Sequence, residues 1–264
     1  MQKVRVKLSG QRDDVIASLD QSKSSIFYQG IQRNMEELQY ETPVTGTVYG
    51  TLLNYKGELA KLGDAVNQDP YNQPPQAPVL YIKPRNTHTS HKQPIPLPKN
   101  IEFIQTGATL GIVIGKTATK LKKESALDYV MGYTVVNDVT VPHESVFRPA
   151  VKHRSRDGFC PMGPWIVEKD SFESPNSVSI RTWVNGKLVQ ENTTANLIRS
   201  VEQLLEDITE FMTLYQGDTL LIGVAEDAPL VQAYDHVRIE IDGAGFLENT
   251  ILPEQEIPLK GGNR

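Results

Sequence analysis

Short apolar runs separated by glycine and proline make up most of this chain. The runs are rich in Val, Ile and Thr, and the polar turns between them use many of the 19 glycines and 17 prolines. Because β-branched residues fit the pleated surface of a sheet, this pattern predicts a mainly β fold (α+β) with few helices. The predicted strands are residues 47–53, 78–83, 109–115, 132–141, 177–184, 218–224 and 236–242.

One hairpin and two helices are also predicted. Asn185 and Gly186 stand between two alternating segments and accept the positive φ angles of a type I′ turn, so residues 179–191 should form a hairpin. Apolar residues at helical spacing predict the clearest helix from Thr194 to about Leu214, with a threonine cap before it. A shorter helix is predicted from Lys123 to Met131.

The chain divides into two parts by its composition. Residues 1–45 are polar with scattered apolar positions, and we expect them to form a small N-terminal subdomain or extension; residues 46–264 should form the main domain. The first residues contain no apolar core of a signal peptide, and no window approaches a membrane span. With a single cysteine, Cys160, an internal disulfide is excluded, and a cytoplasmic location is expected.

The charge pattern excludes one class of partner and leaves another open. The formal net charge is −5, and no basic run suggests a nucleic acid or a membrane surface as partner. Three loops that follow predicted strands nevertheless concentrate polar and charged residues, and loops borne by a rigid sheet commonly carry function. They begin at Lys83 (KPRNTHTSH), Asn137 (NDVTVPHESVFRPAVKHRSRDGFCPMGP) and Gly223 (GVAEDAPLV). A surface loop with ion pairs explains the second of these equally well.

From Val48 to Leu252 the chain resembles the fumarylacetoacetate hydrolase family. The resemblance rests on the order of the motifs LYIKPRNT, GIVIGKTATK, GYTVVNDVT, RDGFCPMGP, NGKLVQENTT and LYQGDTLLIG. Three of them are most similar to the N-terminal half of the members that act in 4-hydroxyphenylacetate (homoprotocatechuate) catabolism, where two family domains are fused. The resemblance implies a rolled, mixed β-sheet and chemistry on unsaturated oxo or hydroxy acids.

The resemblance also implies a divalent cation, Mg²⁺ or Mn²⁺, but this chain departs from the pattern. The family's two glutamates fall on Gly107 and Thr109, and only its aspartate is kept, as Asp138. One carboxylate and a threonine hydroxyl are a poor site for a hard cation, so no metal ligand is assigned. The family's water-activating His and Glu are replaced by Glu58 and Lys61 in NYKGELAK, which argues against its usual hydrolysis.

Basic side chains are expected to supply the missing counter-charge for an anionic substrate. Lys83 matches the family lysine, and Arg154 stands where another lysine is usual; these two are expected to face the oxo-acid end, while Asp138 orients them or shuttles a proton. The predicted substrate-binding residues are Arg85, Arg148 and Asp157. Arg148 is assigned to a distal carboxylate.

Two functions remain open from the sequence. In the first, the chain is a subunit of a decarboxylase/isomerase for acids such as 5-oxopent-3-ene-1,2,5-tricarboxylate and 2-hydroxyhepta-2,4-diene-1,7-dioate in aromatic catabolism. In the second, it is a non-catalytic subunit that supports a metal-bearing paralogue. Either function predicts a homodimer or a complex with a paralogous chain.

Overall fold

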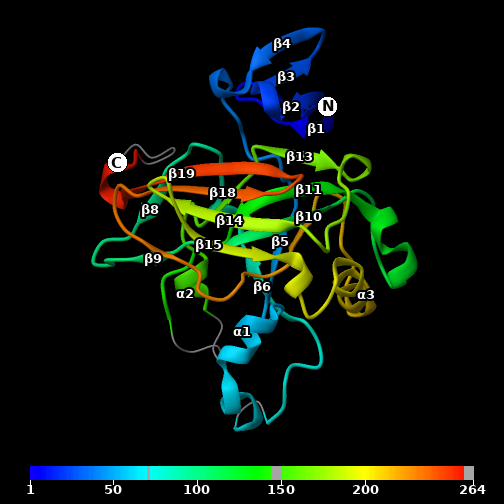
Figure 1. The fold of residues 1–264 in the computed structure, drawn as a ribbon, viewed down its shortest axis with the longest axis vertical. Helices are drawn as coiled ribbons and strands as arrows, with labels where there is room; N and C mark the ends of the chain where they lie inside the picture. Colours follow the sequence, from blue (N-terminus) through cyan, green and yellow to red (C-terminus); the bar gives the residue numbers. More distant parts are fainter. Residues whose placement is uncertain (70–71, 144–149, 259–264) are drawn as a thin grey trace.

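A computed structural model describes residues 1–69, 72–143 and 150–258. Within these ranges the chain forms two main β-sheets with short helices around them, which confirms the predicted mainly β class (Figure 1). The large sheet runs in the order β4-β3-β2-β1-β13-β11-β10-β16-β5-β6, with β12 and β7 attached beside β11. The second sheet runs β15-β14-β18-β19-β8, and β17 pairs with β9.

The strand bounds are as follows. In the large sheet they are β1 (Gln2–Val6), β2 (Val15–Asp20), β3 (Ser25–Tyr28), β4 (Ile31–Asn34), β5 (Val48–Leu52), β6 (Val79–Lys83), β7 (His88–Ser90), β10 (Ala108–Ile114), β11 (Val130–Asn137), β12 (Cys160–Met162), β13 (Trp165–Glu168) and β16 (Thr219–Leu221). The others are β8 (Ile95–Leu97), β9 (Ile104–Gln105), β14 (Ser179–Val184), β15 (Lys187–Thr193), β17 (Leu230–Val231), β18 (His236–Ile241) and β19 (Gly245–Pro253).

The helices are short. The α-helices are α1 (Lys56–Lys61), α2 (Val151–Arg154) and α3 (Val201–Phe211); the 3₁₀ turns are η1 (Gln21–Lys23), η2 (Met35–Glu37), η3 (Gly63–Asn67), η4 (Arg85–Thr87), η5 (Lys123–Tyr129), η6 (Lys169–Ser171), η7 (Thr194–Asn196) and η8 (Glu254–Glu256). Each helix in the described part of the chain is too short or too polar to cross a bilayer.

The core lies on both faces of the central strands β10 and β11. Side chains alternate along a strand, so Leu110 and Ile112 belong to the larger apolar cluster, whereas Val113 belongs to a smaller one on the opposite face. All seven residues of β10 are buried. A strand that is covered on both faces reads as a continuous apolar run, which is why GATLGIVIG carries so little polarity.

The hairpin prediction is confirmed, and both helix predictions need correction. Asn185 and Gly186 have φ angles of 51° and 77° between β14 and β15. The predicted helix 194–214 begins only at Val201, because the N–H groups of residues 198 and 199 donate to the backbone carbonyl and the side chain of Asn54. Ser200, rather than a threonine, caps it. Residues 123–129 form a 3₁₀ turn, not an α-helix.

The N-terminal residues extend the large sheet at one end. Strands β1–β4 stand at the top of Figure 1 and α1 lies at the opposite end. Strand β1 pairs with β13 in antiparallel register, so the first strand continues the central sheet by backbone hydrogen bonds. The division at residue 45 stays a prediction.

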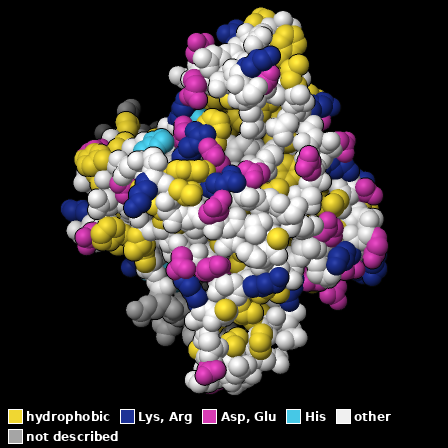
Figure 2. Space-filling view, viewed as in Figure 1, with side chains coloured by type: hydrophobic (Ala, Val, Ile, Leu, Met, Phe, Trp, Pro, Cys, Tyr) yellow, Lys and Arg dark blue, Asp and Glu magenta, His cyan; other side chains and the backbone are white. Residues whose placement is uncertain are grey.

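Figure 2 shows basic and acidic side chains mixed over the visible face, without a large field of one sign. Pairs such as Arg181 with Glu191 and Asp242, at 2.8 Å each, account for part of this mixing. A mixed surface of this kind fits the small formal charge of the chain.

The buried face of α3 should contribute strongly to stability. Leu204 is fully buried, whereas Phe211 on the same helix is 66% exposed. We expect Leu204→Ala to lower the free energy of unfolding by about 2 to 5 kcal/mol, because it removes packed methyl groups and leaves a cavity. Phe211→Ala should change it by no more than about 0.5 kcal/mol. Urea unfolding of both variants checks this, and equal losses would contradict the packing described.

Candidate active site

The side chains of Lys83, Asp138 and Arg154 meet in one buried ion cluster. Lys83 ends β6, Asp138 directly follows β11 and Arg154 ends α2. Lys83 Nζ lies 2.7 Å from Asp138 Oδ1, and Arg154 Nη1 lies 3.1 Å from Asp138 Oδ2. The structure thus brings together the three residues predicted as catalytic from distant parts of the chain; their roles in a reaction stay predictions.

Asn137 fixes the backbone from which Asp138 projects. Its Oδ1 accepts hydrogen bonds from Thr106 Oγ1 (2.8 Å) and from the Gly107 N–H (2.9 Å). The Asp138 N–H in turn donates to the Gly107 carbonyl over 2.8 Å. These bonds hold the exit of β11 against the entry of β10, so the position of the carboxylate is set by main chain rather than by a flexible loop.

Lys83 is fully buried, and its ammonium group is completely engaged. It donates to the backbone carbonyls of Val139 (2.7 Å), Arg154 (3.0 Å) and Phe159 (3.0 Å). An ammonium has three protons, which these three carbonyls accept, and Asp138 supplies the opposite charge. Lys83 therefore serves first as an internal cation that neutralises Asp138 and ties three segments together.

Tyr81 completes the cluster, although it was not predicted from the sequence. It lies two residues before Lys83 on β6, so both side chains extend from the same face, and its hydroxyl donates to Asp138 Oδ2. The Arg154 guanidinium carbon lies 4.5 Å from the centroid of the Tyr81 ring, a cation–π contact. The signal in the sequence was the spacing of Tyr81 and Lys83 on one strand.

The cluster holds its charges fixed around neutral pH. Burial opposes ionisation of Asp138, but the charges of Lys83 and Arg154 outweigh it and hold its pKa below the ordinary value. Burial, together with the neighbouring Asp138, raises the pKa of Tyr81 well above its usual range, so the phenol stays neutral. The buried Cys160 thiol also stays protonated, because burial raises its pKa to about 12.

Glu58, on α1, differs from the residues of the ion cluster in its pKa, which lies near neutral pH. Burial raises the pKa of Glu58 to about 7; Asp138 and Glu226 act in the same direction, whereas a backbone hydrogen bond at Leu53 and the charge of Arg154 act against it. Glu58 was not predicted as a site residue. Its replacement of the family histidine in NYKGELAK was the signal that marked the position.

The predicted substrate-binding residues lie apart from this cluster or outside the described residues. Arg85 and Asp157 are both exposed. Asp157 Oδ1 accepts a hydrogen bond from Asn86 Nδ2 over 2.7 Å, which joins the loop after β6 to the loop after α2. Arg148 falls in the range 144–149, outside the described residues. All three assignments stay predictions.

The donors present at the family's cation position do not fit a divalent metal ion. Gly107 has no side chain, and a Cβ there would lie 2.5 Å from the Asp138 carbonyl oxygen, so a glutamate has no room without a backbone shift. The Asp138 carboxylate is already paired with Lys83 and Arg154. Among the residues that the structure describes, no three His, Cys, Asp or Glu side chains gather as a metal site. A hard cation needs several oxygen ligands, and this set offers too few.

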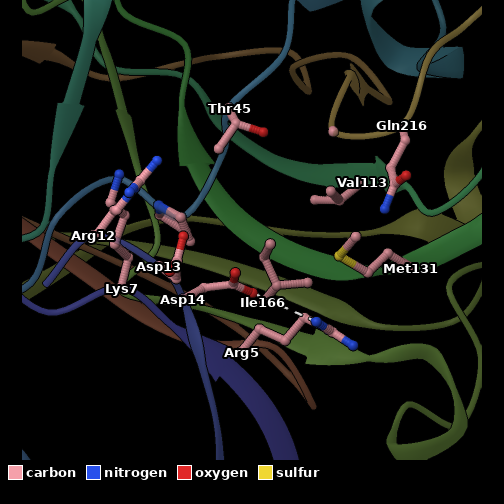
Figure 3. A pocket seen from close by; sticks show the side chains of 12 residues that line it. Arg5, Lys7, Arg12, Asp13, Asp14, Thr45, Val113, Met131, Ile166 and Gln216 are labelled. Carbon is pink, nitrogen blue, oxygen red and sulfur yellow. Dashed lines mark ion pairs between the residues drawn. The ribbon is translucent and has the colours of Figure 1, made fainter.

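A separate cavity of about 360 Å³ is lined by residues of the N-terminal segment and by residues of β10, β11 and β13 (Figure 3). Its floor includes Val113, Met131 and Ile166. Arg5 at its rim is neutralised by Asp14 (3.5 Å) and Glu168 (3.3 Å). Its lining does not include the Lys83–Asp138–Arg154 cluster, so the chemistry-bearing residues lie elsewhere.

Comparison with known proteins identifies the relatives of this chain. A family profile described as "Fumarylacetoacetate (FAA) hydrolase C-terminal" matches residues 47–252. The chain is 40% identical over 212 residues to the 4-hydroxyphenylacetate degradation bifunctional isomerase/decarboxylase of Escherichia coli, a match that covers 80% of this chain and 48% of that protein. The chain thus spans about half the length of the curated relatives it matches first.

Solved structures agree with the fold. The 5-carboxymethyl-2-hydroxymuconate delta-isomerase of Mycobacterium smegmatis superposes with a TM-score of 0.78 at 25% identity, covering 96% of this chain and 99% of that one. A maleylpyruvate hydrolase from Sphingobium, in complex with manganese(II) and pyruvate, superposes with a TM-score of 0.76 at 20% identity, covering 95% and 99%. At 20% identity, the likeness to the maleylpyruvate hydrolase shows a shared fold and no more.

Removing Lys83 should strongly destabilise the protein. Lys83→Met leaves three buried carbonyls without their donor and the Asp138 carboxylate without its closest cation. We expect the free energy of unfolding to fall by about 3 to 5 kcal/mol in urea titrations. Lys92→Met is the matched control, because Lys92 pairs with Glu36 at the surface and should change stability by less than about 1 kcal/mol. Losses of similar size in the two variants would refute the internal-cation role.

Glu58→Gln should change the pH dependence of stability. The folded pKa of Glu58, about 7, lies above its ordinary value of 4.5, so this carboxyl supports folding below pH 4.5 and loses that contribution as pH rises to about 7. Relative to wild type, Glu58→Gln should therefore gain stability between these two pH values, by about 3 kcal/mol at most, and stay constant above. Urea midpoints at pH 4, 6 and 8 measure this; a difference that does not vary with pH would contradict it.

Proposed function

Because the chain belongs to the fumarylacetoacetate hydrolase family, we propose that it isomerises or decarboxylates an unsaturated oxo or hydroxy polycarboxylic acid. Acids such as 2-hydroxyhepta-2,4-diene-1,7-dioate and 5-oxopent-3-ene-1,2,5-tricarboxylate, of 4-hydroxyphenylacetate catabolism, are the proposed substrates. Support comes from the isomerase/decarboxylase relative in Escherichia coli and the delta-isomerase of Mycobacterium smegmatis. We expect the activity in a subunit that pairs with itself or with a paralogous chain.

The observation that carries the proposal is the Arg154 guanidinium at the edge of the buried cluster. Its side chain is 15% exposed, so it alone of the three ionic groups reaches toward solvent, while Lys83 and Asp138 are at 0%. Nη1 is used by Asp138, and Nε is buried without a hydrogen-bond partner among the described residues. A planar guanidinium with unused donors suits a carboxylate or an enolate oxygen.

The charge balance of the cluster favours an anionic substrate. Lys83 and Arg154 carry two positive charges and Asp138 one negative charge, which leaves one net positive charge in a buried setting. Electrostatic interactions are stronger there than in water, so this charge can stabilise the negative charge that develops when an oxo acid enolises. The guanidinium keeps its proton, so Arg154 acts by electrostatics and not as a base.

Arg85 and Asp157 fit a supporting role at the entrance. Both are exposed on loops that leave the cluster, and Asp157 holds Asn86 beside Arg85. We propose that Arg85 attracts the remote carboxylate of the substrate and that Asp157 fixes the loop carrying it. Lys83 and Asp138, which are both buried, hold Arg154 in place from the interior of the protein.

The purified protein, treated with a chelator, should convert at least one of the two proposed acids, followed by CO₂ release and by the loss of diene absorbance. Arg154→Gln should lower kcat/KM by at least about 100-fold, because it removes a charged donor from the developing enolate. Arg154→Lys should keep part of the activity, and Arg181→Gln, which breaks only ion pairs with Glu191 and Asp242 at the surface, should keep all of it.

The opposite result would support the non-catalytic function. If the chelated protein is inert toward both acids, and conversion appears only with a metal-bearing paralogue and survives Arg154→Gln in this chain, the site described here takes no part in the reaction. Urea unfolding of Arg154→Gln separates a lost function from a lost fold, since Asp138 keeps Lys83 as its partner.

A further inference from the structure

Three buried polar atoms near the ion cluster have no hydrogen-bond partner among the described residues. They are Glu58 Oε2, Glu226 Oε2 and the hydroxyl of Tyr55. Tyr55 is fully buried and directly precedes α1, Glu58 lies within α1, and Glu226 lies in the loop after β16. Because buried polar atoms are nearly always paired in folded proteins, these three unpaired atoms mark a candidate site.

The carboxyl group of Glu226 is held by one of its two oxygens. Glu226 Oε1 accepts from Asn192 Nδ2 over 3.2 Å, and the Glu226 carbonyl accepts from Gln190 Nε2 over 2.6 Å. The carboxyl of Glu226 rests against the backbone of Gly57, where a Cβ would come within 2.1 Å of it. Glycine at position 57 is therefore what allows Glu226 to approach α1, the helix that carries Glu58.

Tyr55 directly precedes the helix that carries Glu58. Burial raises the pKa of Tyr55 above its usual range, and the charges of Glu226 and Glu58 add to this. The phenol therefore keeps its proton and can donate a hydrogen bond. Tyr55, Glu58 and Glu226 are called the second cluster below. The Tyr55 hydroxyl is its fully buried donor without a hydrogen-bond partner among the described residues.

The second cluster is continuous with the first. The charges of Arg154 and Asp138 both act on Glu58, and the charge of Glu58 acts on Arg154. Around Glu58 the facing charged groups are thus Arg154 from α2, Asp138 after β11 and Glu226 after β16. A substrate anion held by Arg154 would lie beside the Glu58 carboxyl.

We propose, resting on the function proposed above, that Glu58 is the catalytic acid and base that moves the substrate proton, with Tyr55 and Glu226 as the neighbouring polar groups. The other candidates in the cluster are unsuited. Asp138 is locked as a carboxylate by two cations, Tyr81 stays a neutral phenol, and Arg154 never gives up its proton. Glu58 alone of these changes its charge near neutral pH, where an acid–base catalyst works best.

The steps balance with water as the one additional reactant. In the isomerisation, the enol O–H bond breaks, its electron pair forms the carbonyl, the conjugated double bonds shift, and the remote carbon takes the proton of Glu58. The proton released by the enol returns to the Glu58 carboxylate. In the decarboxylation, the bond to the leaving carboxylate breaks, CO₂ departs, and the electron pair forms an enolate that Glu58 protonates at carbon. Water then returns a proton to Glu58, and the hydroxide that remains combines with CO₂ as bicarbonate.

Proton exchange in D₂O tests this role directly. Wild-type protein should place deuterium on the carbon of the substrate that is protonated, observed by NMR. Glu58→Gln should lower the rates of both exchange and conversion by about 100-fold or more, while the affinity for a saturated seven-carbon dicarboxylate, measured by calorimetry, should change less than about threefold. Lys61→Ala, an exposed position on the same helix paired with Asp227, should behave as wild type.

The pH profile supplies a second, independent readout. Because Glu226 raises the pKa of Glu58, Glu226→Gln should move the activity midpoint assigned to Glu58 to lower pH while activity at the optimum is retained in large part. A merely structural role for Glu58 predicts no such movement.

The possible failures are distinguishable. If wild type converts substrate and Glu58→Gln does so at a similar rate, the role of Glu58 is refuted and the proposed function stands. If the midpoint does not move in Glu226→Gln, the role is refuted as well. Wild-type protein that neither exchanges nor converts either acid overturns the proposed function together with this inference.

Discussion

The buried ammonium of Lys83 is the interaction on which the site depends. It joins the end of β6 to carbonyls at Val139, Arg154 and Phe159, so the segments before and after α2 are held against the sheet by one side chain. A buried charge without a partner is far more costly than a paired one, and Asp138 supplies that partner. The position of Arg154 follows, because its own carbonyl is one of the three acceptors.

Because the charges of the ion cluster are fixed, orienting the guanidinium and transferring a proton fall to two different carboxyl groups. Asp138 is held ionised by Lys83 and Arg154, so it orients the guanidinium and takes no further part in proton transfer. The carboxyl that titrates, Glu58, stands on α1 in a setting dominated by burial. Environments that push the pKa values of two acids in opposite directions are the usual way in which active sites assign acid–base roles.

The sequence predicted those parts of the molecule that depend on local pattern. Short apolar runs rich in Val, Ile and Thr located β5, β6, β10, β11, β14, β16 and β18, and Asn185-Gly186 located the hairpin. The start of α3 could not be predicted, because Asn54, nearly 150 residues earlier, holds the backbone before it. The approach of Glu226 to Glu58 was hidden for the same reason: it depends on packing of a distant loop on Gly57. Family motifs pointed to Lys83, Asp138 and Arg154, but not to the donors and acceptors between them.

The departure from the family pattern at Gly107 and the pairing of Asp138 with Lys83 are physically coupled. The backbone carbonyl of Asp138 occupies the space into which a Cβ at position 107 would extend, and the carboxylate of Asp138 is occupied by the Lys83 ammonium. A glutamate at 107 therefore requires the Asp138 backbone to move, and that movement would strain the bonds that place Asn137 and Lys83. Gly107 and Lys83 thus support each other. Gly107 allows the close approach of β10 and β11, and Lys83 supplies the positive charge that a metal ion provides in a site with more carboxylates.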